Sequence, residues 1–224
     1  MNRREVTIEQ DGLALAGDLT LPLGACGLVL FAHGSGSSRF SSRNRAVASH
    51  LNHAGLATLL FDLLTADEEV IDARTAELRF DIPLLAGRLT GTVDWAGRQP
   101  ALATLPLGLF GASTGAAASL ITAAGRPQQV AAVVSRGGRP DLALPVLARV
   151  RAPTLLIVGG HDREVLALNR EALAALTGEK ALHIVPGATH LFEEPGALDR
   201  VAELAADFFT ALRPVTGAHG PPRP

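Results

Sequence analysis

Short apolar runs alternate with helical segments along most of this 224-residue chain, and this alternation constrains the fold more than any other feature. The runs cover residues 27–32, 56–62, 105–110, 130–134, 155–158 and 181–185. A short apolar run bounded by turn residues is typical of a strand that is buried on both faces. Strands that alternate with helices require right-handed crossovers, and they form a mostly parallel sheet with helices on both faces. We therefore expect a single-domain α/β fold with a doubly wound sheet.

The N-terminal region predicts a hairpin ahead of the parallel strands. Residues 4–10 and 13–22 alternate polar and apolar side chains, and the Asp11-Gly12 pair between them is a turn signal. Helices are expected over residues 43–54, 82–95, 116–123, 142–150, 164–176 and 195–212. Residues 63–80 are expected to form a solvated loop or, alternatively, a substrate-facing loop. A single α/β domain is expected over residues 1–213, and the Pro/Gly-rich residues 214–224 are expected to be a disordered tail.

Composition excludes several classes of partner. The formal net charge is −2, from 20 basic and 22 acidic residues, so there is no general attraction to nucleic acid or to anionic membranes. The single cysteine, Cys26, allows no internal disulfide and is expected to be a small core residue in a reducing compartment. The N-terminus lacks the apolar segment of a signal peptide, and no apolar run approaches the ~20 residues of a membrane span. We expect a cytoplasmic protein with no nucleic-acid or membrane partner, and a homodimer is a possibility on general frequency alone.

The stretch LPLGLFGASTGAAASLITA, residues 105–123, contains a candidate nucleophile. It runs from an apolar strand through a glycine-rich turn into an alanine-rich helix, which holds the hydroxyl of Ser113 at the end of the strand. The two glycines of the pattern Gly-x-Ser-x-Gly are explained by sterics, because a tight turn leaves no room for a Cβ on either side of the serine. Alone it is a weak signal, and its context must decide.

Two further polar residues follow later strands in the order that a hydrolytic triad requires. Asp162 follows the strand at 155–158, and His190 follows the strand at 181–185, so Ser113, Asp162 and His190 should emerge at one edge of the sheet. His190 would act as general base toward Ser113, and Asp162 would orient the imidazole. Asp162 could instead cap the next helix, and Asp141 is a competing candidate for the acid.

The developing oxyanion of such a reaction needs preorganised hydrogen-bond donors. One should be the backbone N–H of Thr114, directly after the nucleophile, and the other the backbone N–H of Ser35 in the loop His33-Gly34-Ser35-Gly36. His33 could brace this loop through its ring nitrogens. The same loop could be interpreted as a phosphate cradle, but it lacks the lysine of a Walker loop and the spacing of a dinucleotide-binding fingerprint.

Candidate substrate contacts come from the loops near the predicted site: Phe40, Arg136 and Leu191. Arg39, Arg43 and Arg45 are expected to form the solvated start of a helix, with the docking of a substrate carboxylate as the alternative. The histidines and acids show none of the familiar metal-binding spacings, so neither a metal nor another cofactor is expected.

Four motifs, FAHGSGSS, GASTG, VGGHD and PGATHLFEEPG, occur in an order and spacing that resemble the α/β-hydrolases, and within them the small, lid-less dienelactone-hydrolase-like group. The resemblance covers about residues 4 to 212. It implies a serine hydrolase that acts on a small ester, thioester or lactone. Dienelactone hydrolases proper carry a cysteine nucleophile where this chain has Ser113, a departure that favours carboxylester hydrolysis.

These observations leave two classes of function open. The first is a serine carboxylesterase-type hydrolase with a small open pocket, with thioesterase and lactonase as variants that use the same triad. The second is a non-catalytic binding protein with an α/β-hydrolase fold and a vestigial site. The presence of serine, aspartate and histidine together favours the first class, because a binding protein has no need of all three.

Overall fold

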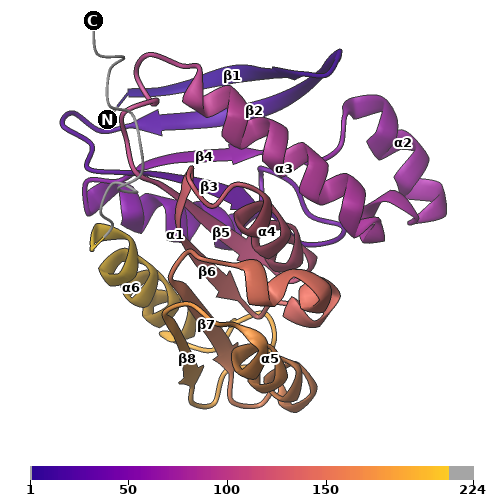
Figure 1. Ribbon diagram of the computed structural model, residues 1–224, viewed down its shortest axis with the longest axis vertical. Coiled ribbons are helices and arrows are strands. Elements are labelled where there is room, and N and C mark those ends of the chain that lie inside the picture. The colour runs from indigo at the N-terminus through magenta and orange to yellow at the C-terminus, as the bar shows by residue number, and fades with distance from the viewer. Residues whose placement is uncertain (1, 212–224) are drawn as a thin grey trace, which may run out of the picture.

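The computed structural model describes residues 2–211, and its centre is an eight-stranded sheet (Figure 1). The strands lie side by side in the order β1-β2-β4-β3-β5-β6-β7-β8. Their bounds are β1 Asn2–Gln10, β2 Leu13–Leu21, β3 Leu28–Ala32, β4 Ala57–Phe61, β5 Leu107–Ala112, β6 Val130–Arg136, β7 Thr154–Gly159 and β8 Lys180–Val185. The hairpin β1–β2 pairs antiparallel and joins β4 antiparallel, while the strands from β4 to β8 are all parallel. The expected α/β fold with an N-terminal hairpin is confirmed.

The helices cover both faces of the sheet. They are α1 Ser42–His53, α2 Ala66–Thr75, α3 Ile82–Gly97, α4 Thr114–Gly125, α5 Arg163–Ala175 and α6 Ala197–Thr210, with 3₁₀ segments η1 Leu78–Phe80 and η2 Pro140–Arg149. Apolar residues of α3, α4, η2 and α5 share one hydrophobic core with the sheet, and those of α1 and α6 share the other. Figure 1 shows the same division, with α3, α4 and α5 on the near face and α1 and α6 on the far face.

The central strands are apolar on both faces because both faces are covered. Every residue of β3, β4, β5 and β7 is buried, which explains why these strands appear in the sequence as continuous apolar runs. β1 and β8 are the two edge strands of the sheet. The N-terminal half of β1 is exposed and β8 is half-exposed, because fewer neighbouring residues pack against an edge strand.

The interpretation of residues 63–80 as a loop is wrong. Most of this segment is α2, which Figure 1 shows projecting beyond the sheet, followed by η1. A capping box starts the helix: the Thr65 side chain accepts from the backbone N–H of Glu68, and the Glu68 side chain accepts from that of Thr65. The acidic residues Asp67, Glu68 and Glu69 occupy the first turn, where they interact favourably with the helix dipole.

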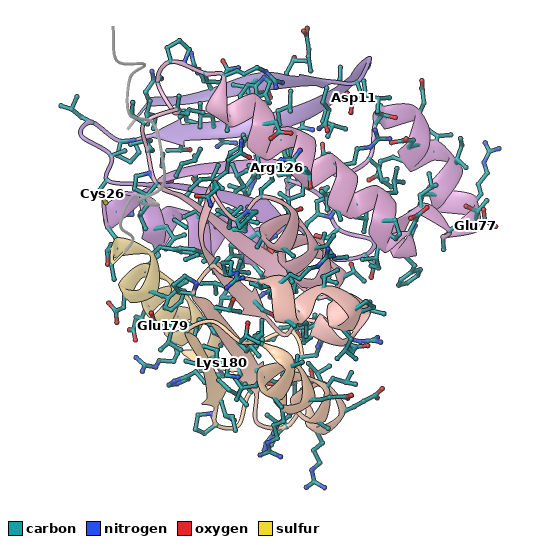
Figure 2. All side chains as sticks on the ribbon, in the orientation of Figure 1. Asp11, Cys26, Glu77, Arg126, Glu179 and Lys180 are labelled. Carbon is teal, nitrogen blue, oxygen red and sulfur yellow. The ribbon has the colours of Figure 1, made fainter. Side chains whose placement is uncertain are left out.

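Two smaller expectations also need correction. Cys26 is exposed rather than part of the core, because it lies in the loop before β3, at the amino ends of the parallel strands (Figure 2). The helix expected at 142–150 is the 3₁₀ segment η2, and Pro145 inside it cannot donate the backbone hydrogen bond that an α-helix needs.

The predicted tail, residues 214–224, lies outside the described part of the chain. Within residues 2–211, no helix combines the length and apolar character needed to cross a bilayer.

Candidate active site

Ser113 occupies a strained turn between β5 and α4. Its backbone has φ 51° and ψ −120°, a conformation that few residues other than glycine adopt. The backbone N–H of Ser113 donates to the carbonyl of Arg136 at 3.3 Å, and the N–H of Arg139 donates to the carbonyl of Ser113 at 3.1 Å. Arg136 is the last residue of β6 and Arg139 lies three residues further on, so the end of this strand and the segment after it fix the turn in place.

The glycines around Ser113 permit close backbone packing. A Cβ on Gly115 would lie 2.6 Å from the carbonyl oxygen of His33 and closer still to that of Ala32. A Cβ on Gly111 would lie 2.6 Å from the carbonyl oxygen of Gly115. These are backbone atoms that cannot rotate away, so the spacing Gly-x-Ser-x-Gly follows from packing at this turn.

The structure brings Asp162 and His190 into direct contact. His190 lies in the loop after β8, and Asp162 lies in the loop after β7. Nδ1 of His190 is 2.6 Å from Oδ2 of Asp162. Asp162 occupies the N-cap position of α5, but its side chain makes no capping hydrogen bond because it faces the histidine. The competing acid, Asp141, is held instead by a two-pronged contact with Arg139 at 2.9 and 2.7 Å.

Ser113 and His190 both contact the backbone at Arg136 and Gly137. Ser113 is hydrogen-bonded to Arg136, and a Cβ on the next residue, Gly137, would lie 3.2 Å from the His190 carbonyl oxygen and 3.6 Å from its Cε1. Gly137 has φ +51° and no side chain, which leaves the histidine loop free to approach the serine turn. Among the described residues Ser113 Oγ forms no hydrogen bond with the imidazole, a contact that commonly tightens only when substrate binds.

The two predicted oxyanion donors lie on adjacent pieces of backbone. Thr114 begins α4, and Ser35 lies in the loop after β3, next to Gly34. An ideal Cβ on Gly34 would lie 3.1 Å from the Ser113 Cβ, so this loop packs directly against the nucleophile turn. Within residues 2–211 the backbone N–H groups of Thr114 and Ser35 donate to no protein acceptor. They are therefore available to a ligand at this edge of the sheet.

His33 links this loop to the segment after β4. Its Nε2 accepts the backbone N–H of Leu63 at 3.1 Å, so the proton is on Nδ1, which donates to the carbonyl of Gly34 at 3.0 Å. Burial lowers the pKa of His33, although the hydrogen bond to Gly34 and the charge of Asp62 act in the opposite direction. The neutral ring is thus locked in one tautomer and braces the loop.

Phe40 is about half exposed, and two guanidinium groups lie close to its ring. The Cζ atoms of Arg39 and Arg45 are 4.3 and 4.8 Å from its ring centroid. Arg39 forms an ion pair with Asp62, and Arg45 forms one with Asp18 at 3.1 Å. Both arginines therefore have carboxylate partners within the chain.

The other predicted substrate contacts differ in accessibility. Leu191, next to the catalytic histidine candidate, is exposed, whereas Arg136 is buried. Arg43 lies 3.3 Å from the carboxylate of Glu193, two residues after Leu191.

One group of residues beside the site was missed from the sequence. Arg79 in η1 donates to Asp72 of α2 through its backbone N–H at 3.0 Å and its Nε at 2.6 Å, and its Nη1 would lie 3.2 Å from a Cβ on Gly36. A cavity of about 10 Å³, enough for one water molecule, lies between this segment and the loop at His33. The signal that could have found the segment was the capping-box pattern at Thr65 and Glu68.

No cluster of three or more histidine, cysteine or acidic side chains that could hold a metal ion exists among residues 2–211.

Two curated relatives are similar to most of this chain. They come from two strains of Mycobacterium tuberculosis, CDC 1551 / Oshkosh and H37Rv, and each bears the name "Putative phosphoribosyl transferase". Each is 57% identical over 205 residues, which is 92% of this chain but 45% of the relative. The chain therefore spans less than half the length of these relatives.

Several solved structures are similar to this chain over nearly its whole length. A crystal structure of dienelactone hydrolase from Anabaena variabilis ATCC 29413 has a TM-score of 0.93 and 58% identity, covering 95% of this chain and 99% of that one. Est1E from Butyrivibrio proteoclasticus has a TM-score of 0.77 and 17% identity, covering 92% and 97% of the two chains, which shows the shared fold. The model of the dienelactone hydrolase family matches residues 26–212. This chain belongs to the dienelactone hydrolase family, and its fold is the α/β-hydrolase fold.

Proposed function

We propose that this chain is a serine hydrolase that cleaves small carboxylic esters through an acyl-enzyme intermediate. The observation that carries the proposal is the 2.6 Å contact between His190 and Asp162, at the sheet edge where a positive-φ turn holds Ser113. A nucleophile, a base and an acid that orients the base are the three groups that covalent acyl transfer requires.

In the first half of the reaction, Nε2 of His190 takes the proton of the Ser113 hydroxyl as Oγ attacks the acyl carbon. Asp162 accepts a hydrogen bond from the Nδ1–H of His190 throughout and stabilises the imidazolium that forms. The backbone N–H groups of Thr114 and Ser35 donate to the oxygen that becomes negative. His190 then protonates the departing alkoxide, which leaves Ser113 acylated.

In the second half, the same groups act on water. His190 removes a proton from a water molecule that attacks the acyl carbon, and the oxyanion is again held by the two backbone donors. His190 returns the proton to Ser113 Oγ as the acid is released. No step requires a metal or another cofactor.

The connection between β6 and β7 and the length of the curated relatives both bear on the choice of ester hydrolysis over the alternatives. The connection from β6 to β7 carries η2 rather than a cap domain, which supports an open pocket for small substrates. Thioesters and lactones suit the same triad and are variants of this proposal. The transferase name belongs to relatives more than twice as long as this chain. The segment shared with them amounts to 92% of this chain and so overlaps most of the part that matches a hydrolase family, and we carry no transferase activity over to this chain.

The test is active-site labelling combined with turnover. Wild-type protein should show a burst and steady turnover with p-nitrophenyl acetate and butyrate, and a fluorophosphonate should add a single adduct by intact mass. Ser113→Ala should lose both the adduct and turnover, while Ser49→Ala, which changes an exposed serine of α1, should keep both. A folded Ser113→Ala protein that still turns over substrate would contradict the proposal.

A further inference from the structure

Asn169 is a fully buried asparagine in the middle of α5. Its Nδ2 donates two hydrogen bonds, one to the carbonyl of Val165 at 2.8 Å and one to the carbonyl of Gly138 at 3.0 Å. Both partners are carbonyl oxygens, so only the NH2 side of the amide fits between them. The bond to Val165 stays within the helix, whereas the bond to Gly138 reaches the segment that follows β6.

The side-chain oxygen of Asn169 is left without a partner. Oδ1 is buried and accepts no hydrogen bond from any residue of the range 2–211. Buried polar atoms nearly always have a partner, because an unsatisfied one costs the free energy of its lost hydration. Part of the stability gained through the two Nδ2 bonds is therefore lost again at Oδ1. Stability alone is an incomplete reason for an asparagine here, and attention turns to what the bond to Gly138 holds.

The bonded carbonyl belongs to a peptide group that also holds the nucleophile turn. The carbonyl of Gly138 and the N–H of Arg139 are parts of one planar peptide unit, and this N–H donates to the carbonyl of Ser113 at 3.1 Å. A rotation of the unit about its Cα–Cα axis would turn both groups away from their partners. Gly137 and Gly138 precede this unit, and glycine offers little resistance to such a rotation. The bond from Asn169 is what opposes it.

The turn at Ser113 needs this support because its conformation is unfavourable. A φ of 51° at a serine persists only where the surroundings hold it. The N–H of Ser113 donates to the carbonyl of Arg136 at 3.3 Å, which is long for a hydrogen bond. The bond that Ser113 accepts from Ala116 at 3.1 Å lies within the start of α4. The contact with Arg139 is therefore the shorter of the two hydrogen bonds that connect this turn to the segment at β6.

The helix that contains Asn169 also presents the acid of the proposed triad. Asp162 occupies the N-cap of α5, and Asn169 follows it by about two helical turns. Ser113 occupies the N-cap of α4, and Figure 1 shows α4 and α5 on the same face of the sheet. One hydrogen-bonded path thus joins the helix that presents the acid to the turn that presents the serine.

We propose that Asn169 is a positioning residue of the active site, which fixes the peptide unit between Gly138 and Arg139 and, through it, the turn at Ser113. This inference rests on the proposed serine-hydrolase function. Asn169 acts through the backbone of Ser113 and not on the substrate, so its loss should slow acyl transfer and leave ligand binding nearly unchanged. A displacement of about 1 Å at a reacting group can lower a rate about 100-fold.

The experiment measures how fast a fluorophosphonate labels Ser113, with its binding constant and its maximal labelling rate determined separately. Asn169→Leu has a side chain of similar size and lacks both donors. The maximal labelling rate and the kcat with p-nitrophenyl acetate should both fall by about 10- to 100-fold, while the binding constant changes little. Labelling should still reach one adduct per chain. A protein that is merely less stable would instead have fewer reactive molecules, each with the wild-type labelling rate.

Asn52→Leu is the matched control. Asn52 lies near the C-terminal end of α1 and is also buried. Its Nδ2 likewise donates twice, to the carbonyl of Leu56 at 3.0 Å and to Oγ1 of Thr58 at 2.9 Å. This variant should lose about as much Tm as Asn169→Leu and keep the wild-type labelling rate. An equal fall of the labelling rate in both variants would reduce the effect to a general loss of stability and overturn the inference.

Asn169→Ser keeps the test decisive if Asn169→Leu does not fold. A serine in a helix can donate to the carbonyl four residues earlier, here that of Val165, but its side chain is too short to reach Gly138. Its labelling rate should also fall. A folded variant of Asn169 with wild-type labelling and turnover would overturn the inference and leave the proposed function standing. A wild type that takes no adduct and shows no turnover would overturn both.

Discussion

Replacement of His33 by leucine tests how the loop beside the nucleophile is held. The imidazole makes two hydrogen bonds: it accepts from the buried Leu63 N–H at 3.1 Å and donates to the partly buried Gly34 carbonyl at 3.0 Å. Leucine has similar volume and makes neither contact. The substitution therefore removes hydrogen bonding at this site while it largely preserves packing.

The expected loss of stability follows from these two contacts. A buried N–H that loses its acceptor costs about 1–3 kcal/mol, and the Gly34 carbonyl, which lies nearer the surface, costs less. Burying a polar imidazole costs free energy that leucine does not cost, and this offsets part of the loss. We therefore expect the free energy of unfolding to fall by about 2 kcal/mol. In a chain of this size that corresponds to a fall in Tm of about 4–8 °C.

The expected catalytic loss comes from the displaced oxyanion donor. Removal of one such donor commonly lowers kcat by about 10²- to 10³-fold, and a loop that is only loosened should lose part of that. Urea denaturation and kcat with p-nitrophenyl acetate measure the two effects separately. His33→Gln is the matched variant, because its side-chain oxygen can still accept from Leu63 and should recover part of both losses. If His33→Leu keeps its unfolding free energy within about 0.5 kcal/mol and its kcat, the bracing role is refuted.

Three further predictions concern other parts of the site. Asp162→Asn should lower kcat by about 10⁴-fold while the protein stays folded, since the amide no longer selects the productive tautomer of His190; wild-type kinetics would exclude this acid. Gly115→Ala should destabilise the fold by about 3 kcal/mol or more in denaturation experiments, because its Cβ would meet the backbone of the loop at His33, and unchanged stability would mean that the turn can relax. Although burial alone would raise the pKa of Asp72, hydrogen bonds from Arg79 lower it, so this carboxylate contributes stability that is present above the ordinary carboxyl pKa and lost as the pH falls through the lowered value. Acid should therefore destabilise the wild type more steeply than Asp72→Asn, and parallel pH–stability curves would show that the pair has no such effect.

The fold class could be predicted because its signals are local and repeated. A strand covered on both faces must be apolar at every position, as β3 and β5 are, and helices between such strands leave few topologies to consider. The same reasoning failed at α2, where acidic composition was given more weight than the capping pattern at Thr65 and Glu68. It also failed at Cys26, since a residue just before a buried strand can still face solvent.

The sequence by itself determined which residue types stand at the carboxyl ends of the strands, and hence the candidates Ser113, Asp162 and His190. Parallel strands bring those ends to one edge whatever the details of packing, so position along the chain was sufficient to group them. The tautomer of His33 and the side-chain partner of Arg136 were decided only by the tertiary structure. His33 is set by Leu63, 30 residues away, and Arg136 contacts Asn44 across 92 residues. Whether a buried polar group is satisfied depends on everything that surrounds it in space, and no local pattern in the sequence carries that information.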